Sequence, residues 1–206
     1  MFGHLSGLEI AFVLITVIVS IGLHEAMHGF TAFKLGDRTA ADLGRITLNP
    51  LAHIDLFTTV LLPLLLISTG LPPFFAAKPV PFNPARVKWD EYGAALVGVS
   101  GPLTNLLLAV LGAGLFHLVP YGLADDFFGI FVSINVALFV FNMIPFPPLD
   151  GSRLLYAFAP EGLQNIMLRI EQLGLIAILI LMILFFRVLG PVIISIDQNI
   201  INLLLG

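Results

Sequence analysis

Long apolar runs separated by short polar segments make up most of this chain. Four runs can each cross about 30 Å of hydrocarbon as a helix, and they cover approximately residues 8–33, 92–119, 127–144 and 173–194. A shorter apolar stretch at 56–69 contains Pro63 and is followed by two further prolines. The pattern predicts an all-α polytopic membrane protein, with the short stretch as a re-entrant or interfacial hairpin.

The composition supports a membrane protein and excludes several other classes. Of the 206 residues, 58% are hydrophobic and 11% are charged, and the mean hydropathy is +1.04, far from the balance of a soluble domain. No linker, low-complexity tract or internal repeat divides the chain, so we expect one domain over residues 1–206. The net charge of −4 and the lack of a basic patch argue against a nucleic-acid partner and leave the lipid bilayer as the expected surroundings. Without cysteines, disulfides and thiolate ligands are excluded.

The distribution of charge predicts the orientation in the membrane. The connection near residues 119–127 holds Asp125 and Asp126 and no Lys or Arg, whereas the other connections carry basic groups, namely Lys34, Arg38, Arg45, Lys78, Arg86, Lys88, Arg153 and Arg169. By the positive-inside rule the basic segments are cytoplasmic and the acidic turn lies outside. A crossing at 56–69 would separate its two basic flanks, which is why we expect a hairpin there. Arg187, near the outer end of the last run, fits this scheme less well.

Two histidines and a glutamate lie in the second half of the first apolar run. The sequence His24-Glu25-Ala26-Met27-His28 places the histidines four residues apart, on one face of a helix, where both imidazoles can bind one metal ion. Glu25 projects to a neighbouring side, from which it can handle a proton of metal-bound water. Ionisable groups at membrane depth are costly, so they are functional candidates.

The third apolar run ends in a second polar motif. Prolines at positions 145, 147 and 148 stop the helix after Asn142 and are followed by Asp150 and Gly151. Because this run and the first both enter from the outside, Asp150 reaches a depth similar to that of the histidines. A catalytic zinc has three protein ligands and one open position, so we expect Asp150 to complete the set with His24 and His28. The alternative for Asp150 is a helix cap.

This set of residues predicts a hydrolytic mechanism. Zinc would lower the pKa of its bound water to about 7, and Glu25 would take the proton and pass it to the leaving amine. Asn142 is a candidate donor to the oxyanion. It could equally tie down the end of the broken helix.

The motifs together resemble the site-2 proteases, a family of intramembrane zinc metalloproteases, in the compact subfamily without PDZ or CBS domains. His24–His28 resembles the first family motif, and Asn142, Pro145, Asp150 and Gly151 resemble the second. Further similar segments are Gly101–Asn105, Gly44–Pro50 and Ala77–Pro81. The resemblance implies a core of three helices, here the spans 8–33, 92–119 and 127–144. It also implies hydrolysis of a peptide bond in or near a transmembrane segment of a membrane-protein substrate, as in regulated intramembrane proteolysis.

Several expectations stay open at the level of sequence. The segment Leu43–Leu48 is a candidate for a short β element that could bind an extended substrate. Gly101 and Asn105 are expected to allow close helix contact and an interhelical hydrogen bond. His53 is expected to be an interfacial polar residue, with a place at the site or its entrance as the alternative. A membrane metal-ion transporter and a catalytically inactive scaffold are the alternative functions. We expect a multi-pass protein of a prokaryotic cell membrane, with its active site open to the cytoplasm.

Overall fold

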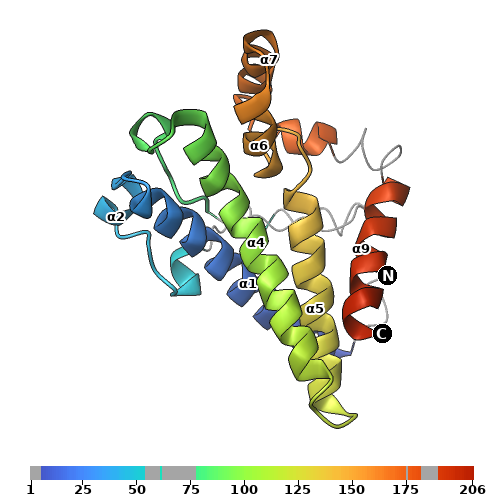
Figure 1. Cartoon of the computed structure of the whole chain (residues 1–206). Coiled ribbons are helices and arrows are strands. Elements are labelled where there is room, and N and C mark those ends of the chain that lie inside the picture. The colour runs from blue at the N-terminus through green and yellow to red at the C-terminus, as the bar shows by residue number, and fades with distance from the viewer. Residues whose placement is uncertain (1–5, 54–60, 62–77, 175, 182–189) are drawn as a thin grey trace.

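Three long helices form the centre of the molecule (Figure 1). The computed structural model describes residues 6–53, 61, 78–174, 176–181 and 190–206. Within these residues, three helices are long and apolar enough to cross a membrane, namely α1 (Gly7–Lys34), α4 (Asp90–Phe116) and α5 (Leu123–Asn142). These helices cover most of the three predicted core spans, and the prediction of an all-α membrane protein is confirmed.

Shorter elements complete the chain. They are α2 (Thr39–Asp42), η2 (Pro50–His53), η4 (Pro84–Arg86), α6 (Gly151–Phe158), α7 (Glu161–Glu171) and α9 (Gly190–Leu205). In Figure 1, α2, α6 and α7 lie at the same end of the bundle, and the turn between α4 and α5 lies at the opposite end. Arg38, the N-cap residue of α2, and Arg153 of α6 are therefore separated from Asp125 and Asp126, which lie in the first turn of α5.

Local sequence explains where the long helices begin and end. Ser6 caps α1 by accepting a hydrogen bond from the backbone of Glu9, whose side chain in turn accepts from the backbone of Ser6, a capping box. At its other end, α5 stops at Asn142 because the prolines that follow cannot continue the hydrogen-bond ladder. This stop allows the chain to turn back toward α1.

Small residues let the helices pack closely. The interface between α4 and α5 is built from Ala109 and Ala113 facing Val132, Val136 and Val140, and a Cβ added at Gly112 would lie 2.7 Å from Phe131. Such residues are typical of helix contacts in membranes. The large side chains on the outer faces of α1 and α4 are instead exposed, as a membrane-facing surface requires. They include Leu8, Leu14, Ile15, Leu103, Leu107 and Leu111.

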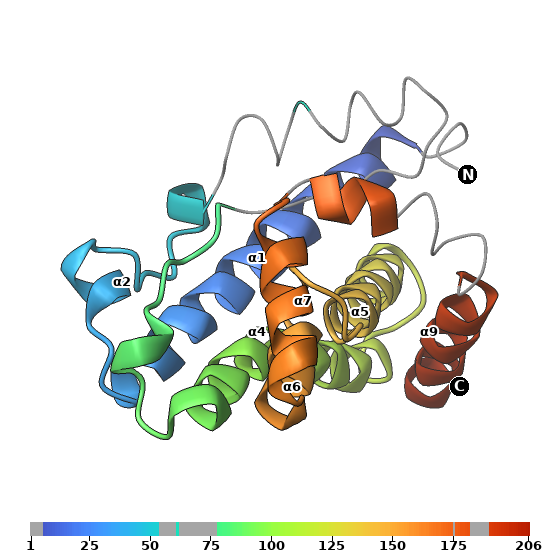
Figure 2. The same ribbon diagram turned by 90° about the horizontal axis from the view of Figure 1, so that it is seen from above.

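One further helix, α9, packs on the bundle, and two predicted segments lie largely or partly outside the described residues. α9 packs on α4 and α5, and its Ile200, Ile201 and Leu204 contact the α4–α5 core; Figure 2 shows it on the side of α5 away from α1. The last predicted span, 173–194, lies partly outside the described residues, although 176–181 are helical. The hairpin expected at 56–69 lies outside them except for residue 61.

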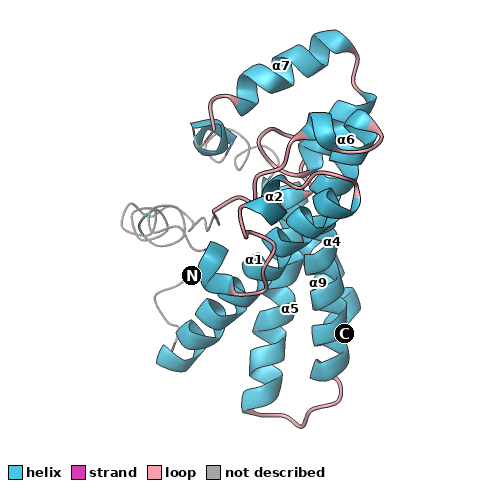
Figure 3. Cartoon of the chain, turned by 90° about the vertical axis from the view of Figure 1, so that its left-hand side faces the viewer, coloured by secondary structure: helices cyan, strands magenta, loops and turns pink. Residues whose placement is uncertain are grey.

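The described residues contain helices and loops and no strand (Figure 3). The short β element considered for Leu43–Leu48 is therefore wrong within this structure. Gly44 adopts a φ of +63°, which turns the chain at the start of the segment, and Arg45 donates hydrogen bonds to the carbonyls of Ala52 and Lys78. The segment is fixed by this side chain rather than by backbone pairing.

Candidate metal centre

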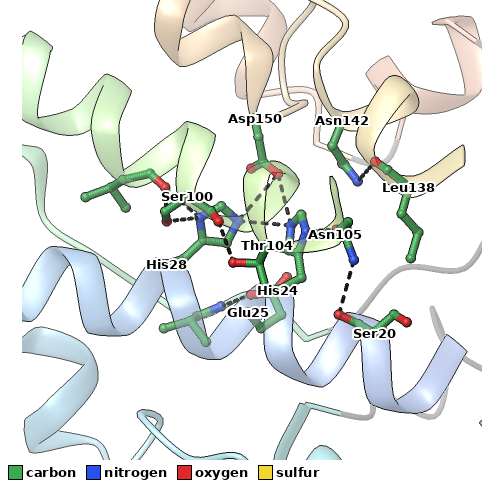
Figure 4. A network of polar contacts seen from close by, with 12 residues as sticks. Ser20, His24, Glu25, His28, Ser100, Thr104, Asn105, Leu138, Asn142 and Asp150 are labelled. Atoms are coloured by element: carbon green, nitrogen blue, oxygen red, sulfur yellow. Dashed lines mark hydrogen bonds and ion pairs between the residues drawn. The ribbon is translucent and has the colours of Figure 1, made fainter. Parts of the chain in front are cut away.

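His24 and His28 lie side by side on the buried face of α1 (Figure 4). Both side chains are buried, and their Nε2 atoms are 3.0 Å apart. The i, i+4 spacing places the second ring one turn after the first. Their position in a long apolar helix explains the burial, since the same face packs against α4.

Asp150 reaches the two histidines from the other side. Its Oδ2 lies 3.0 Å from Nε2 of His24 and 3.4 Å from Nε2 of His28. Although Asp150 occupies the N-cap position of α6, its side chain makes no capping hydrogen bond. The turn that brings it there requires a glycine next to it, because a Cβ at Gly151 would lie 2.3 Å from the carbonyl oxygen of Met143.

The three side chains fit a zinc ion. Their ligand atoms all lie within 4.8 Å of one another. Tetrahedral ligation at about 2.0–2.1 Å places ligand atoms about 3.3 Å apart, close to the 3.0–3.4 Å distances between these atoms. Two imidazoles and one carboxylate leave a fourth position for water, which is the donor set of a catalytic site.

The outer nitrogens of both rings have acceptors. Nδ1 of His24 is 2.6 Å from Oδ1 of Asn105, and Nδ1 of His28 is 2.7 Å from the carbonyl oxygen of Val97. Because each oxygen can only accept, both Nδ1 atoms carry the proton and both Nε2 lone pairs are available for a metal. The expected interhelical hydrogen bond of Asn105 is therefore present, and its partner is a histidine of the site.

Gly101 provides the space in which the histidines sit. A Cβ at this position would lie 2.4 Å from Nε2 of His28 and 2.6 Å from Nε2 of His24. No side chain larger than hydrogen fits there without moving both rings. Close approach, rather than backbone freedom, explains this glycine.

Glu25 points away from the ring nitrogens toward an extended segment, residues 78–83, that we call the strap. Its Oε2 accepts a hydrogen bond of 2.8 Å from the backbone N–H of Val80. Because Pro79 and Pro81 lack an N–H, Val80 is the only donor in the three-residue sequence Pro79-Val80-Pro81, and Glu25 takes it.

The strap is fixed near both ends. Lys78 donates its N–H to the carbonyl of His53 and accepts from Arg45 through its own carbonyl. At the far end, the N–H of Asn83 donates to Asp37, 2.6 Å away. Burial tends to raise the pKa of Asp37, but hydrogen bonds from Thr39 and Asn83 outweigh it and lower that pKa below its usual value.

Asn142 and His53 behave differently from the metal-binding group. The amide of Asn142 donates to the carbonyl of Leu138, 2.9 Å away, so this contact ties down the end of α5, and the oxyanion role stays a prediction. His53 is 2% exposed and hydrogen-bonds through Nε2 to the carbonyl of Thr47. It is buried within the protein as part of the strap's anchorage, and its place at the membrane interface stays a prediction.

Sequence reasoning missed three supporting groups. They are the carbonyl of Val97, the N–H of Val80 and the side chain of Asn135, which accepts a hydrogen bond from Asn105. The first two are backbone atoms and leave no signal in the residue type. Asn135 did leave one, since it is a buried amide in an apolar helix, where such residues normally bond to a neighbouring helix.

Residues 118–186 match the model of peptidase family M50. The chain is 38% identical to the "Putative zinc metalloprotease YwhC" of Bacillus subtilis, over 82% of this chain and 79% of YwhC. It is 31% identical to a protein of Mycolicibacterium smegmatis with the same description, Rip2, over 81% of this chain and 64% of Rip2. No solved structure matches.

Proposed function

The chain belongs to peptidase family M50, the site-2 protease family, and we propose that it hydrolyses a peptide bond in or near a transmembrane segment of a membrane-protein substrate. It is a membrane zinc metalloprotease. The observation that carries the proposal is the convergence of His24, His28 and Asp150 beside Glu25, within a bundle whose outer faces are apolar.

In this proposal each side chain has a defined role. His24 and His28 bind zinc through Nε2, and Asp150 binds it through a carboxylate oxygen. When bound, zinc supplies a water molecule of lowered pKa and polarises the scissile carbonyl. Glu25 takes the proton of the attacking water and delivers it to the leaving nitrogen.

The contacts of Glu25 support its role as the proton carrier. One carboxylate oxygen accepts the N–H of Val80, which fixes the rotation of the group. The second oxygen is then left for proton transfer. For Asn142 we propose a hydrogen bond to the oxyanion, donated by the second N–H of the amide whose first N–H binds the carbonyl of Leu138.

The position of the site within the bundle favours a substrate that arrives through the membrane. A peptide bond in a helix hides its carbonyl within the backbone hydrogen-bond ladder, so the substrate helix has to unwind before it is cut. Substrates of this class include the targets of regulated intramembrane proteolysis. The strap beside Glu25, exposed at Lys78, Pro79 and Pro81, lies at the end of the bundle where an unwound segment could be solvated.

The experiment that tests the function compares wild type with Glu25→Gln in lipid vesicles, using a reporter that carries one transmembrane helix. Wild type should cut the reporter, and Glu25→Gln should retain one zinc per chain while losing at least about a thousandfold in rate. Zinc content is measured on the same preparations. Undiminished cleavage by Glu25→Gln would defeat the mechanism, and cutting restricted to soluble peptides would defeat the substrate class.

We propose that the strap end of the bundle faces the cytoplasm of a bacterial cell. The basic residues at this end and the acidic turn at the other support this orientation, and the relatives that match are bacterial. Because the chain has no cysteine, single cysteines can be labelled selectively. With an impermeant maleimide, Tyr121→Cys, 97% exposed in the α4–α5 turn, should react on intact cells, and Leu48→Cys, 72% exposed, should react only after permeabilisation. The reverse pattern would invert the orientation.

The two alternative functions have less support. Among the described residues, metal-ligating side chains form one compact group, and the sequence has no pair of corresponding half-motifs of the kind that inverted-repeat transporters carry. An inactive scaffold would not need both a fourth coordination position open to water and a glutamate fixed by a hydrogen bond beside it. Zinc uptake into vesicles without cleavage of any membrane reporter would favour the transporter.

A further inference from the structure

We propose that Asn135 is a positioning residue for the zinc site: it fixes which face of the Asn105 amide meets His24, and thereby which ring nitrogen of His24 is presented to the metal. This inference rests on the proposed role of His24 as a ligand. The described hydrogen bonds of the Asn135 side chain join it to Asn105 and Phe131, so it acts on His24 through Asn105.

The side-chain amide of Asn105 has two faces with opposite consequences. If its oxygen faces His24, the ring carries its proton on Nδ1 and offers the Nε2 lone pair to zinc. If its NH₂ group faces His24, Nδ1 becomes the acceptor and the proton moves to Nε2, where it blocks ligation. Both arrangements satisfy the pair locally, so the pair alone does not choose between them.

Asn135 removes this ambiguity. Nδ2 of Asn105 donates to Oδ1 of Asn135 across 3.1 Å, and Nδ2 of Asn135 donates to the backbone carbonyl of Phe131 across 2.9 Å. A carbonyl can only accept, so the series has a fixed direction, from His24 through Asn105 and Asn135 to Phe131. Reversing Asn105 would place its oxygen against Oδ1 of Asn135, where neither atom can donate.

Burial prevents the two amides from reversing this direction. Asn105 and Asn135 are both 0% exposed, so water cannot replace a lost partner, and an unsatisfied amide at this depth is unfavourable. The second contact of Asn105 Nδ2, with the carbonyl of Ser20, is longer at 3.4 Å. Asn135 is therefore the main acceptor that holds the amide in place.

The competing explanation is that Asn135 only joins α4 to α5. Interhelical amide bonds commonly do this in membranes. The two explanations differ when Asn105 is replaced by aspartate, because a carboxylate accepts through both oxygens and has no wrong face. A positioning role for Asn135 then becomes unnecessary, whereas a role in joining the helices does not.

The test is the zinc affinity of the full chain in detergent, measured by competition with a chromophoric chelator. Asn135→Leu should weaken zinc binding about tenfold, the lower part of the range for groups that orient a metal ligand. Ser133→Ala is the matched control, since Ser133 makes an intrahelical bond to Gly129 on the same helix and lies outside the series. Its affinity should stay within about twofold of wild type.

The decisive arm adds Asn135→Leu to Asn105→Asp. In that background the carboxylate already accepts from His24 and turns its other oxygen toward Oδ1 of Asn135, so the second substitution should leave zinc affinity unchanged or increase it. An equal loss in both backgrounds, or no loss in either, would overturn the inference. Asn135→Ala provides a second variant, and thermal unfolding of the zinc-free proteins identifies any variant that fails to fold. His24→Ala is measured in parallel: unchanged affinity there would refute the ligand assignment itself, whereas a failure of the Asn135 arms alone would leave the proposed function standing.

Discussion

The two histidines of the site meet the same chemical requirement in two different regions of α4. His24 is held by the side chain of Asn105, which depends on Asn135 in α5. His28, one turn closer to the strap, is held by the backbone carbonyl of Val97. Both arrangements protonate Nδ1, but the first uses two buried side chains and the second uses none.

The difference shows where the site is sensitive to substitution. A backbone carbonyl in a helix has a fixed direction and cannot act as a donor. The acceptor of His28 therefore remains in place whichever side chain stands at position 97. A side-chain amide can reverse and can be lost. The side-chain support of His24 should therefore be sensitive to mutation, whereas the backbone support of His28 should not.

The largest effect should come from Gly101→Ala, which acts on both histidines at once. The added methyl group would overlap Nε2 of each ring, so we expect loss of bound zinc and of cleavage. Zinc content per chain is the measurement. Gly114→Ala is the matched control on the same helix, because nothing lies within 4 Å of its Cβ; it should keep its zinc and gain up to about 1 kcal/mol of helix stability. A fully loaded, active Gly101→Ala would contradict the geometry of the site.

The difference between the supports of the two histidines is tested by comparing Asn105→Leu with Val97→Ala. Asn105→Leu removes the acceptor of His24 Nδ1 and should weaken zinc binding about 10- to 100-fold. Val97→Ala keeps the carbonyl and should leave zinc affinity within about threefold, although the loss of buried methyl groups costs about 2 kcal/mol of stability. Both affinities are obtained by chelator competition. Equal losses in the two variants would show that the two supports do not differ.

Glu25, like His28, is held by a backbone atom, in its case the N–H of Val80 in the strap. Val80→Pro removes the N–H and keeps an extended backbone, since residue 80 already precedes a proline. We expect kcat to fall about tenfold, equivalent to a lost hydrogen bond to a charged group, while KM and zinc content change little. Val80→Ala keeps the N–H and serves as the control. A change confined to KM would assign the strap to substrate binding instead.

The smallest effect should come from Ser100→Ala. The Ser100 hydroxyl donates to the carbonyl of Val97 and lies 3.5 Å from Nδ1 of His28, too long to replace the 2.7 Å bond. Zinc affinity and cleavage should therefore change less than about threefold. A large loss in either measurement would mean that His28, like His24, relies on a side chain.

Much of the site could be predicted from the sequence because its signals were local. The spacing of His24 and His28 defines a helix face, and the prolines after Asn142 define where α5 must end. The rest depends on how the helices are rotated against one another. Which polar group of α4 meets which histidine, and that Asn135 points inward, follow from the packing of small residues on α4, a property of the assembled bundle.

The wrong prediction of a strand and the unforeseen burial of His53 have a similar cause. The segment at Leu43–Leu48 contains residues that suit a strand, but a strand needs a neighbour with which to pair, and here Arg45 binds the carbonyls that surround it. His53 was expected at the membrane interface because it lies at the start of the short apolar stretch, and its burial within the protein was not foreseen. It is buried because its imidazole bonds to Thr47, a contact between residues of one folded loop that periodicity does not reveal.

The separation of the ligands along the chain has a consequence for biogenesis. His24 and His28 emerge from the ribosome early, whereas Asp150 follows more than a hundred residues later. A nascent chain whose first helices are already inserted therefore has two of the three ligands. With the proposed ligand set, full zinc binding has to wait until α5 has entered the membrane and the chain has turned back to bring Asp150 to the histidines.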